Sequence, residues 1–210
     1  MKTTDALAES LGVPESLIAR LKATDRVVLV ASNPNITRRH IRQAQITPRS
    51  LVFSFNKCRQ LHKLPFDTSH YLVHRYGVRD KHYFGYPHKL RVRLFERFAR
   101  DTTTLLLDGE AEPADGKHVY GIPMLGKLSL LENYPFDTLP ERGGASTGFY
   151  MIALLAELKT ALGLDFSMAL IGFTDGGGGR QWYGHAWEFE RQMTARLNPE
   201  MIEVFPKKQT

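Results

Sequence analysis

Runs of consecutive apolar residues alternate with amphipathic stretches along most of this chain. RVVLVAS (26–32) and SLVFSFN (50–56) are apolar runs that end in small polar residues, and NPNITRRHIRQAQI (33–46) lies between them as a turn and a helix. An apolar run without polar alternation is typical of a strand that is buried on both faces of a parallel sheet. Two such strands joined by a helix predict a βαβ unit.

The pattern continues as strands and helices around a less regular middle. Helices are predicted at 1–24 (one or two, broken near Gly12 and Pro14), 90–101, 146–162 and 185–197, and strands at 70–77, 102–109, 166–173 and 201–206. This order predicts a single domain over residues 1–210 with an open, mostly parallel, Rossmann-like α/β sheet and helices on both faces. Within it, residues 1–24 form an N-terminal helical segment. Residues 110–143 are predicted to form an irregular, mobile connector. A loop at 109–123 overlaps the start of this connector, and a hairpin is one option within that loop.

Composition narrows the class of protein. The chain is 42% hydrophobic, which is enough for a core, and a single cysteine, Cys58, excludes both a disulfide framework and a cysteine-based zinc site. Twenty-eight basic against 22 acidic residues give a net charge of +6, which suits a phosphate-bearing ligand, nucleic acid or an acidic surface, and equally suits plain solubility. There is no apolar signal core and no run near the roughly 20 apolar residues of a membrane span, so we expect a cytoplasmic chain.

Polar clusters occur where strands end and helices begin. Residues 32–35 (SNPN) follow the first strand without either glycine-rich phosphate motif, so they are either nucleotide-binding amides and hydroxyls or an ordinary helix-capping turn. Asn56 ends the second strand. GGASTG (143–148) opens a helix, where it is either an anion site or a simple cap. Ligands bind at the carboxyl edge of such sheets, so these clusters are candidate site residues.

Other motifs are absent or weak. Four histidines at 70, 74, 82 and 88 lie among tyrosines, but no H-E-x-x-H or D-x-D occurs, so neither a metal site nor a cofactor is expected. G-x-S-x-G is also absent. The basic stretch from Arg38 to Arg49 lacks interleaved aromatic residues, which favours a solvated helix face over a nucleic-acid patch.

HAWEFE (185–190) places a histidine and two glutamates at a helix start. Carboxylates in a first turn interact favourably with the helix dipole, which explains Glu188 and Glu190 without any chemistry. His185 has no such explanation. Because an imidazole titrates near neutrality, His185 is a candidate general base.

Taken in order, these motifs resemble the animal-type sialyltransferase family. VVLVASNPNI…LVFSFNKC is similar to its L motif, ASTGFYMIALLAEL…MALIGF to its S motif, and His185 with Glu190, separated by four residues, to its VS motif. The resemblance covers roughly residues 26–58 and 143–198. It implies a compact, bacterial-like relative with a sialyltransferase-like variant of the GT-A fold. It also implies metal-independent, inverting transfer of an acidic sugar from a CMP donor to a glycan or other hydroxyl acceptor.

The resemblance also implies roles for single residues. His185 matches the catalytic base, and Glu190 matches a glutamate that supports the site. The positions expected to contact the donor are Ser32, Asn33, Asn56, Ser146, Thr147 and Gly148. The family's third motif has no clear counterpart. GGGGRQWYG (176–184) stands in its place, where Arg180 or Tyr183 would support the donor phosphate. The L–S disulfide is impossible with one cysteine.

Two other classes of function stay open at this point. A protein that kept the fold and lost transfer would bind a nucleotide without catalysis, and the missing third motif favours this alternative. A basic RNA-binding protein would use the Arg38–Arg49 face and would bind oligonucleotides with a strong dependence on salt. Our expectation remains the transferase, with no nucleic-acid partner and no membrane span.

Overall fold

The computed structural model describes residues 11–77, 82–84, 89–107, 119–122, 128–141, 143–173 and 181–205. In this part of the chain, eight strands form one sheet, in which seven follow the order β6-β5-β3-β2-β1-β7-β8 and β4 pairs with β3. The strands are β1 (Arg26–Val30), β2 (Ser50–Phe55), β3 (Ser69–Gly77), β4 (His82–Phe84), β5 (Asp101–Leu107), β6 (Val119–Ile122), β7 (Ser167–Ile171) and β8 (Glu200–Ile202). The seven strands of the main order are parallel, and β4 is antiparallel to β3. The Rossmann-like α/β fold predicted from the sequence is confirmed.

The direction of strand addition reverses beside β1. From β1 the chain adds β2, β3, β5 and β6 on one side, then returns through a helix to place β7 and β8 on the other side. The carboxyl ends of β1 and β7 therefore border a topological switch point, which is the usual place for a ligand in an open α/β sheet. Parallel register extends this edge, with Val30 opposite both Ser54 of β2 and Ile171 of β7.

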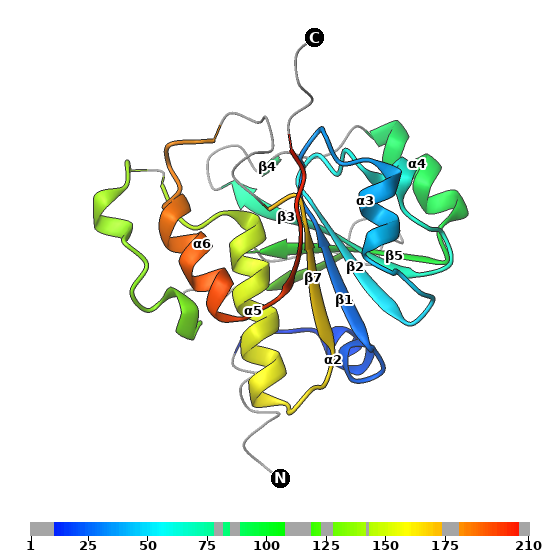
Figure 1. Ribbon diagram of the computed structural model, residues 1–210, viewed down its shortest axis with the longest axis horizontal. Coiled ribbons are helices and arrows are strands. Elements are labelled where there is room, and N and C mark those ends of the chain that lie inside the picture. The colour runs from blue at the N-terminus through cyan, green and yellow to red at the C-terminus, as the bar shows by residue number, and fades with distance from the viewer. Residues whose placement is uncertain are drawn as a thin grey trace.

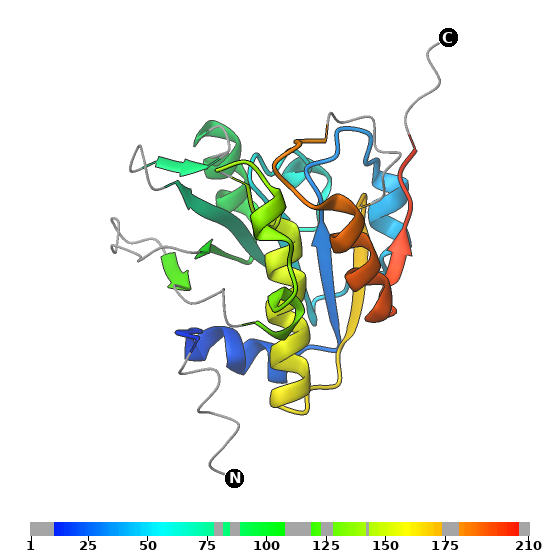
Figure 2. The ribbon, with the colours of Figure 1, turned by 90° about the vertical axis from the view of Figure 1, so that its left-hand side faces the viewer.

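Five α-helices and three 3-10 helices are described. They are α2 (Glu15–Lys22), α3 (Arg38–Gln43), α4 (Lys89–Phe98), α5 (Thr147–Ala161), α6 (Trp187–Arg196), η1 (Leu61–Lys63), η3 (Ser129–Leu131) and η4 (Phe136–Thr138). Figure 1 shows α5 and α6 on one side of the sheet and α3 and α4 on the other. The quarter-turned view of Figure 2 shows α5 lying along that side of the strands, with α6 beside it.

The core consists of two apolar layers divided by the sheet. Alternate side chains of a strand point to opposite faces, so Val27 and Leu29 pack with α2 and α5 while Val28 and Val30 pack with α3 and α4. Because both faces are covered, β2 is buried at every position. This explains why its sequence is a continuous apolar run rather than an alternating one.

Most predicted elements are confirmed, and the middle of the chain differs. Residues 119–122 form β6, parallel to β5, where the sequence suggested only a loop or a hairpin. The connector predicted at 110–143 is described over residues 119–122, 128–141 and 143. It contains η3 and η4, and Leu131 and Tyr134 within it are buried. Strand β6 is short and few apolar residues flank it in the sequence, so no alternating pattern of a strand can be recognised there.

Among the described residues, no helix combines the length and apolar character required to span a bilayer.

Candidate functional site

The loop after β1 is held closely against its neighbours at the switch point. The Ser32 hydroxyl donates to the carbonyl oxygen of Phe55 at 2.5 Å, and the Asn33 side-chain oxygen accepts from the Asn35 N–H at 2.9 Å. Gly172, just after β7, has a φ of 75°, and a Cβ there would lie 3.2 Å from the Cβ of Asn33. The polar turn is therefore a rigid, closely packed part of the edge.

Asn56 joins this turn to the start of α5. It adopts a left-handed conformation with a φ of 50°, which asparagine tolerates better than most residues. The Thr147 hydroxyl donates to its side-chain oxygen at 3.4 Å. Since Ser32 bonds to the carbonyl of the preceding Phe55, the structure brings Ser32, Asn56 and Thr147 together from three separate segments.

Ser146 is the N-cap of α5, so of the two options open for GGASTG the cap is present. Its hydroxyl oxygen accepts from the Phe149 N–H at 3.1 Å and donates to a carboxylate oxygen of Glu190 at 2.6 Å. The Ser146 N–H donates to the other oxygen of Glu190 at 2.7 Å. The hydroxyl predicted to contact the donor is therefore engaged within the protein, whereas the first-turn N–H groups of Thr147 and Gly148 have no intrahelical partners.

Glu190 is a buried carboxylate that links three parts of the fold. It is 6% exposed and accepts a third hydrogen bond, at 2.9 Å, from the hydroxyl of Tyr134. Burial raises the pKa of Glu190, and the bonds from Ser146 and Tyr134 together with the positive charge of Arg75 oppose that rise. Glu190 therefore clamps the start of α5 and the 128–141 segment to α6, and its contribution to the site is positional.

His185 lies two residues before α6, whose N-cap is Ala186. Its ring nitrogen Nδ1 is 2.5 Å from the carbonyl oxygen of Gly144. A carbonyl oxygen only accepts hydrogen bonds, so Nδ1 carries a proton and Nε2 of the neutral ring keeps its lone pair. Burial lowers the pKa of His185, the charge of Arg75 lowers it further, and the bond to Gly144 opposes both. The ring is therefore neutral at pH 7 and able to accept a proton.

Aromatic rings and tight backbone contacts hold this imidazole in place. Trp182 and Trp187 meet the His185 ring edge to face, with centroids 4.7 and 5.0 Å away. The Trp187 indole donates to the carbonyl of Trp182 at 2.8 Å, which closes the loop. A Cβ on Gly184 would overlap the ring of Trp182, so any larger residue there would displace that ring from its position beside His185.

The backbone on both sides of His185 is also fixed. The Gly144 N–H donates to the Gly184 carbonyl at 2.8 Å, and the Ala186 N–H donates to the Tyr134 hydroxyl at 2.9 Å. Gly144, which holds His185, is three residues before Thr147. Since successive Cα atoms are 3.8 Å apart, the Cα atoms of Gly144 and Thr147 lie within about 11 Å of each other. The imidazole and the polar edge are therefore both anchored at the start of α5.

Arg75 is a site residue that sequence reasoning missed. It lies near the end of β3, where one Nη donates to the Ala145 carbonyl at 3.0 Å and the other to the Tyr150 hydroxyl at 3.4 Å. The guanidinium carbon is 4.7 Å from the centre of the Tyr150 ring. Arg75 supports the backbone just before α5 and places a positive charge near His185. The available signal was weak: a charged residue near the end of the strand predicted at 70–77.

The remaining residues that the sequence suggested for the site lie in different surroundings. Gly148 lies against Phe173, where a Cβ would come 2.6 Å from the ring, so its absence of a side chain serves packing. The Tyr183 side chain is 78% exposed, and Arg180 lies outside the described residues. Glu188 is exposed, pairs with Arg191 and accepts from Gln192 at 2.7 Å, as expected for a first-turn surface charge.

Two of the histidines weighed for a metal site are buried in the sheet. Burial lowers the pKa of both His70 and His74 to about 4, so these rings stay neutral. His70 contacts the Pro65 carbonyl oxygen at 2.8 Å and meets the Phe95 ring edge to face. In the described portion of the chain, no group of three or more His, Cys, Asp or Glu residues is placed to hold a metal ion.

Comparison of the chain with protein-family models, with curated proteins and with solved structures gives no match. The side chains at this edge of the sheet are therefore the basis for inferring function.

Proposed function

We propose that this protein is an inverting, metal-independent glycosyltransferase that moves an acidic sugar, sialic acid or a similar one, from a CMP donor to a hydroxyl acceptor. The observation that carries the proposal is the protonation state and tautomer of the His185 ring. Its Nδ1 is occupied by the Gly144 carbonyl oxygen, its Nε2 keeps a lone pair, and its pKa is lowered, so it is a competent general base at neutral pH.

The polar edge supports a nucleotide site beside this base. Ser32, Asn33 and Asn56 place hydroxyl and amide groups at the switch point, where α/β sheets bind ligands. Each group makes one hydrogen bond within the protein and keeps further hydrogen-bonding capacity. The start of α5 adds first-turn N–H groups and the positive end of the helix dipole, which favour a phosphate or a carboxylate. CMP carries a single phosphate, so a helix start offsets a larger share of its charge than for a diphosphate.

The reaction would require one proton transfer to the protein. The acceptor oxygen forms a bond to the anomeric carbon as the bond from that carbon to the CMP phosphate oxygen breaks, and CMP leaves with the electron pair. His185 takes the acceptor proton at Nε2. General-base assistance of this kind contributes about 10²- to 10⁴-fold in rate. The Glu190 clamp acts indirectly, because it fixes the start of α5 and, through Tyr134, the backbone next to His185.

The first test asks whether the nucleotide binds. Thermal shift with CMP, CDP, UDP, GDP and CMP-sialic acid should show a selective rise of the midpoint with the cytidine monophosphate ligands, because binding to the folded state stabilises it. The absence of a CMP response would overturn the proposal. A CMP response without CMP release from CMP-sialic acid, over a panel of hydroxyl acceptors, would indicate a non-catalytic nucleotide-binding protein instead.

The second test isolates the base. His185→Asn keeps a donor that can reach the Gly144 carbonyl but removes the basic nitrogen. We expect it to lower turnover about 10²- to 10⁴-fold while CMP affinity, measured by calorimetry, stays the same. Glu188→Gln, on the same helix start but exposed, is the matched control and should leave turnover unchanged. Normal turnover in His185→Asn would remove His185 from the mechanism.

A further inference from the structure

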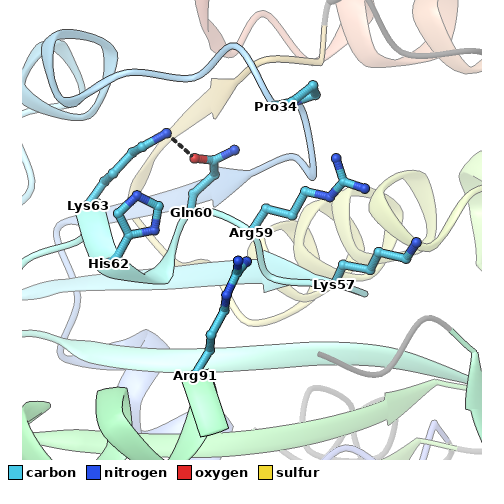
Figure 3. A pocket seen from close by; sticks show the side chains of 7 residues that line it. All are labelled: Pro34, Lys57, Arg59, Gln60, His62, Lys63 and Arg91. Atoms are coloured by element: carbon cyan, nitrogen blue, oxygen red, sulfur yellow. Dashed lines mark hydrogen bonds between the residues drawn. The ribbon is translucent and has the colours of Figure 1, made fainter. Parts of the chain in front are cut away.

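A cationic pocket opens next to the polar edge, at residues that sequence reasoning did not select. Its volume is about 510 Å³, and its lining includes Lys57, Arg59, Gln60, His62, Lys63 and Arg91. Figure 3 shows that these side chains come from the loop after β2, from η1 and from α4, and that Arg91 reaches up from α4 toward Gln60 and Arg59. The pocket is assembled from segments about 30 residues apart, so no local motif marks it.

Buried hydrogen bonds hold one wall of this pocket. Gln60 is 3% exposed, and its amide nitrogen donates to the Asn33 carbonyl. The Lys63 ammonium donates to the Gln60 side-chain oxygen at 2.7 Å and to the Ile36 carbonyl at 2.5 Å. These bonds tie the loop after β1 to the loop after β2 and fix Gln60 and Lys63 in the wall, whereas the other cationic side chains of the lining are exposed.

The other cations lack an acidic partner within the described part of the chain. None of the described residues that line the pocket is an aspartate or glutamate, and no ion pair between described residues involves Lys57, Arg59 or Arg91. The positive charges of the pocket also act on the imidazole of His62. Burial lowers the pKa of His62, and the charges of Lys63 and Arg91 lower that pKa further. Positive charges that lie close together without an anion repel one another, and an anion bound in the pocket would reduce this repulsion.

We propose that this pocket binds a phosphorylated sugar, with the phosphate held by Arg59, Arg91 and Lys57 and the hydroxyl groups facing Gln60 and His62. Guanidinium groups match phosphate geometry through paired N–H donors. A volume of about 510 Å³ exceeds what a bare phosphate fills and lies within the usual range for small-ligand sites. Among the described residues that line the pocket there is no Phe, Tyr or Trp, the large aromatic side chains on which proteins usually stack a nucleobase.

The pocket lies next to the candidate site in the chain. Its lining residues Pro34 and Lys57 directly follow Asn33 and Asn56, and Gln60 bonds the backbone of Asn33. A phosphorylated sugar bound here would be the acceptor, and this role, unlike the binding itself, rests on the proposed function. The expected acceptor class is a glycan bearing a phosphate group near the reacting hydroxyl.

Binding can be tested with glucose 6-phosphate as the probe, by calorimetry at fixed ionic strength. We expect the double variant Arg59→Gln/Arg91→Gln to weaken binding at least tenfold, since each lost charged hydrogen bond is worth about tenfold or more. Arg39→Gln/Arg42→Gln removes the same charge from the exposed face of α3 and serves as the control, with little change expected. Equal losses in both variants would show a general charge effect and overturn the site.

Further arms identify the ligand. Glucose should not bind, and inorganic phosphate should bind more weakly than glucose 6-phosphate; equal affinities for the two phosphates would refute a sugar site. By NMR, saturating glucose 6-phosphate should raise the pKa of His62, because a bound anion offsets the adjacent cations. Saturating CMP should leave glucose 6-phosphate affinity within twofold. Full competition would assign the pocket to the nucleotide phosphate and overturn the proposal, and a protein that binds glucose 6-phosphate but not CMP would separate this inference from the proposed function.

Discussion

Tyr134→Phe tests the buried clamp that positions His185. The substitution removes one oxygen atom and keeps the ring. That oxygen donates to Glu190 at 2.9 Å and accepts from the Ala186 N–H at 2.9 Å. The ring itself packs among Phe136, Phe149 and Phe189, so phenylalanine should occupy the same space. The change therefore isolates two hydrogen bonds from the packing of an aromatic side chain.

The expected loss follows from those two bonds. A hydrogen bond to a charged group contributes about 1.5–3 kcal/mol, and a buried N–H left without an acceptor costs about 1–3 kcal/mol. One hydroxyl serves both groups, so the terms are not fully additive, and we expect the free energy of unfolding to fall by about 2–4 kcal/mol. For a chain of this size, each kcal/mol lowers the midpoint by about 2–4 °C, which gives a total shift of roughly 5–15 °C.

The loss should also depend on pH. Burial raises the pKa of Glu190 from its ordinary value of 4.5, and the Tyr134 bond opposes the rise, so the variant raises that pKa further. A carboxyl that binds its proton more tightly in the folded state is stabilising below its unfolded pKa, and this stability is lost as pH rises toward the folded pKa. The variant should therefore be less destabilised at about pH 5 than at about pH 7.5.

The assay is urea unfolding followed by circular dichroism at both pH values, with Tyr183→Phe as the control. Tyr183 is 78% exposed, so losing its hydroxyl should change stability by less than about 0.5 kcal/mol. If Tyr134→Phe is no more destabilising than this control, the hydroxyl is not the link between Glu190 and the His185 loop. An equal loss at both pH values would contradict the electrostatic part of the reasoning.

Three further outcomes are expected. In the pH profile of kcat/KM, the fall in activity on the acid side should occur below pH 6.5, because the pKa of His185 is lowered. Arg75→Gln removes a positive charge and should shift this fall to higher pH. A fall at the same pH in the variant would mean that another group titrates. Gly148→Ala should destabilise the fold by about 1–3 kcal/mol, because its Cβ would meet the Phe173 ring, and thermal unfolding that shows a gain instead would refute this packing argument. Cys58 is buried and burial raises the pKa of its thiol, so it should react with a thiol reagent only as the protein unfolds, and rapid reaction in the native state would disagree.

The candidate site shows where local pattern was informative. Ser32, Asn56 and Thr147 were selected because polar residues follow apolar runs or begin a helix, and parallel strands bring such positions to one edge. A cap was one option for the residues that begin α5, and Ser146 is that cap. Its donor-binding role stays a prediction, since the sequence does not reveal that its hydroxyl is bonded to Glu190.

Other features of the site have little local signal. The helix-start pattern treats Glu190 and Glu188 alike, and only the family resemblance singled out Glu190. In the structure Glu190 is buried beneath three donors and Glu188 is exposed. The partners of Glu190 lie 44 and 56 residues away. Arg75 contacts Ala145 across 70 residues, and such pairs are determined by strand order rather than by periodicity.

By itself, the sequence determined the alternation of buried strands and amphipathic helices, the parallel sheet that follows from it, and the edge at which a ligand would bind. The periodicity of apolar residues indicates which side of a segment is buried, so these features can be predicted without knowing which segments pack against one another. Only the tertiary structure decided the strand order, the orientation of His185 by Gly144, the Glu190 clamp and the cationic pocket. Each of these depends on contacts between distant segments, and such contacts exist only after the sheet has assembled.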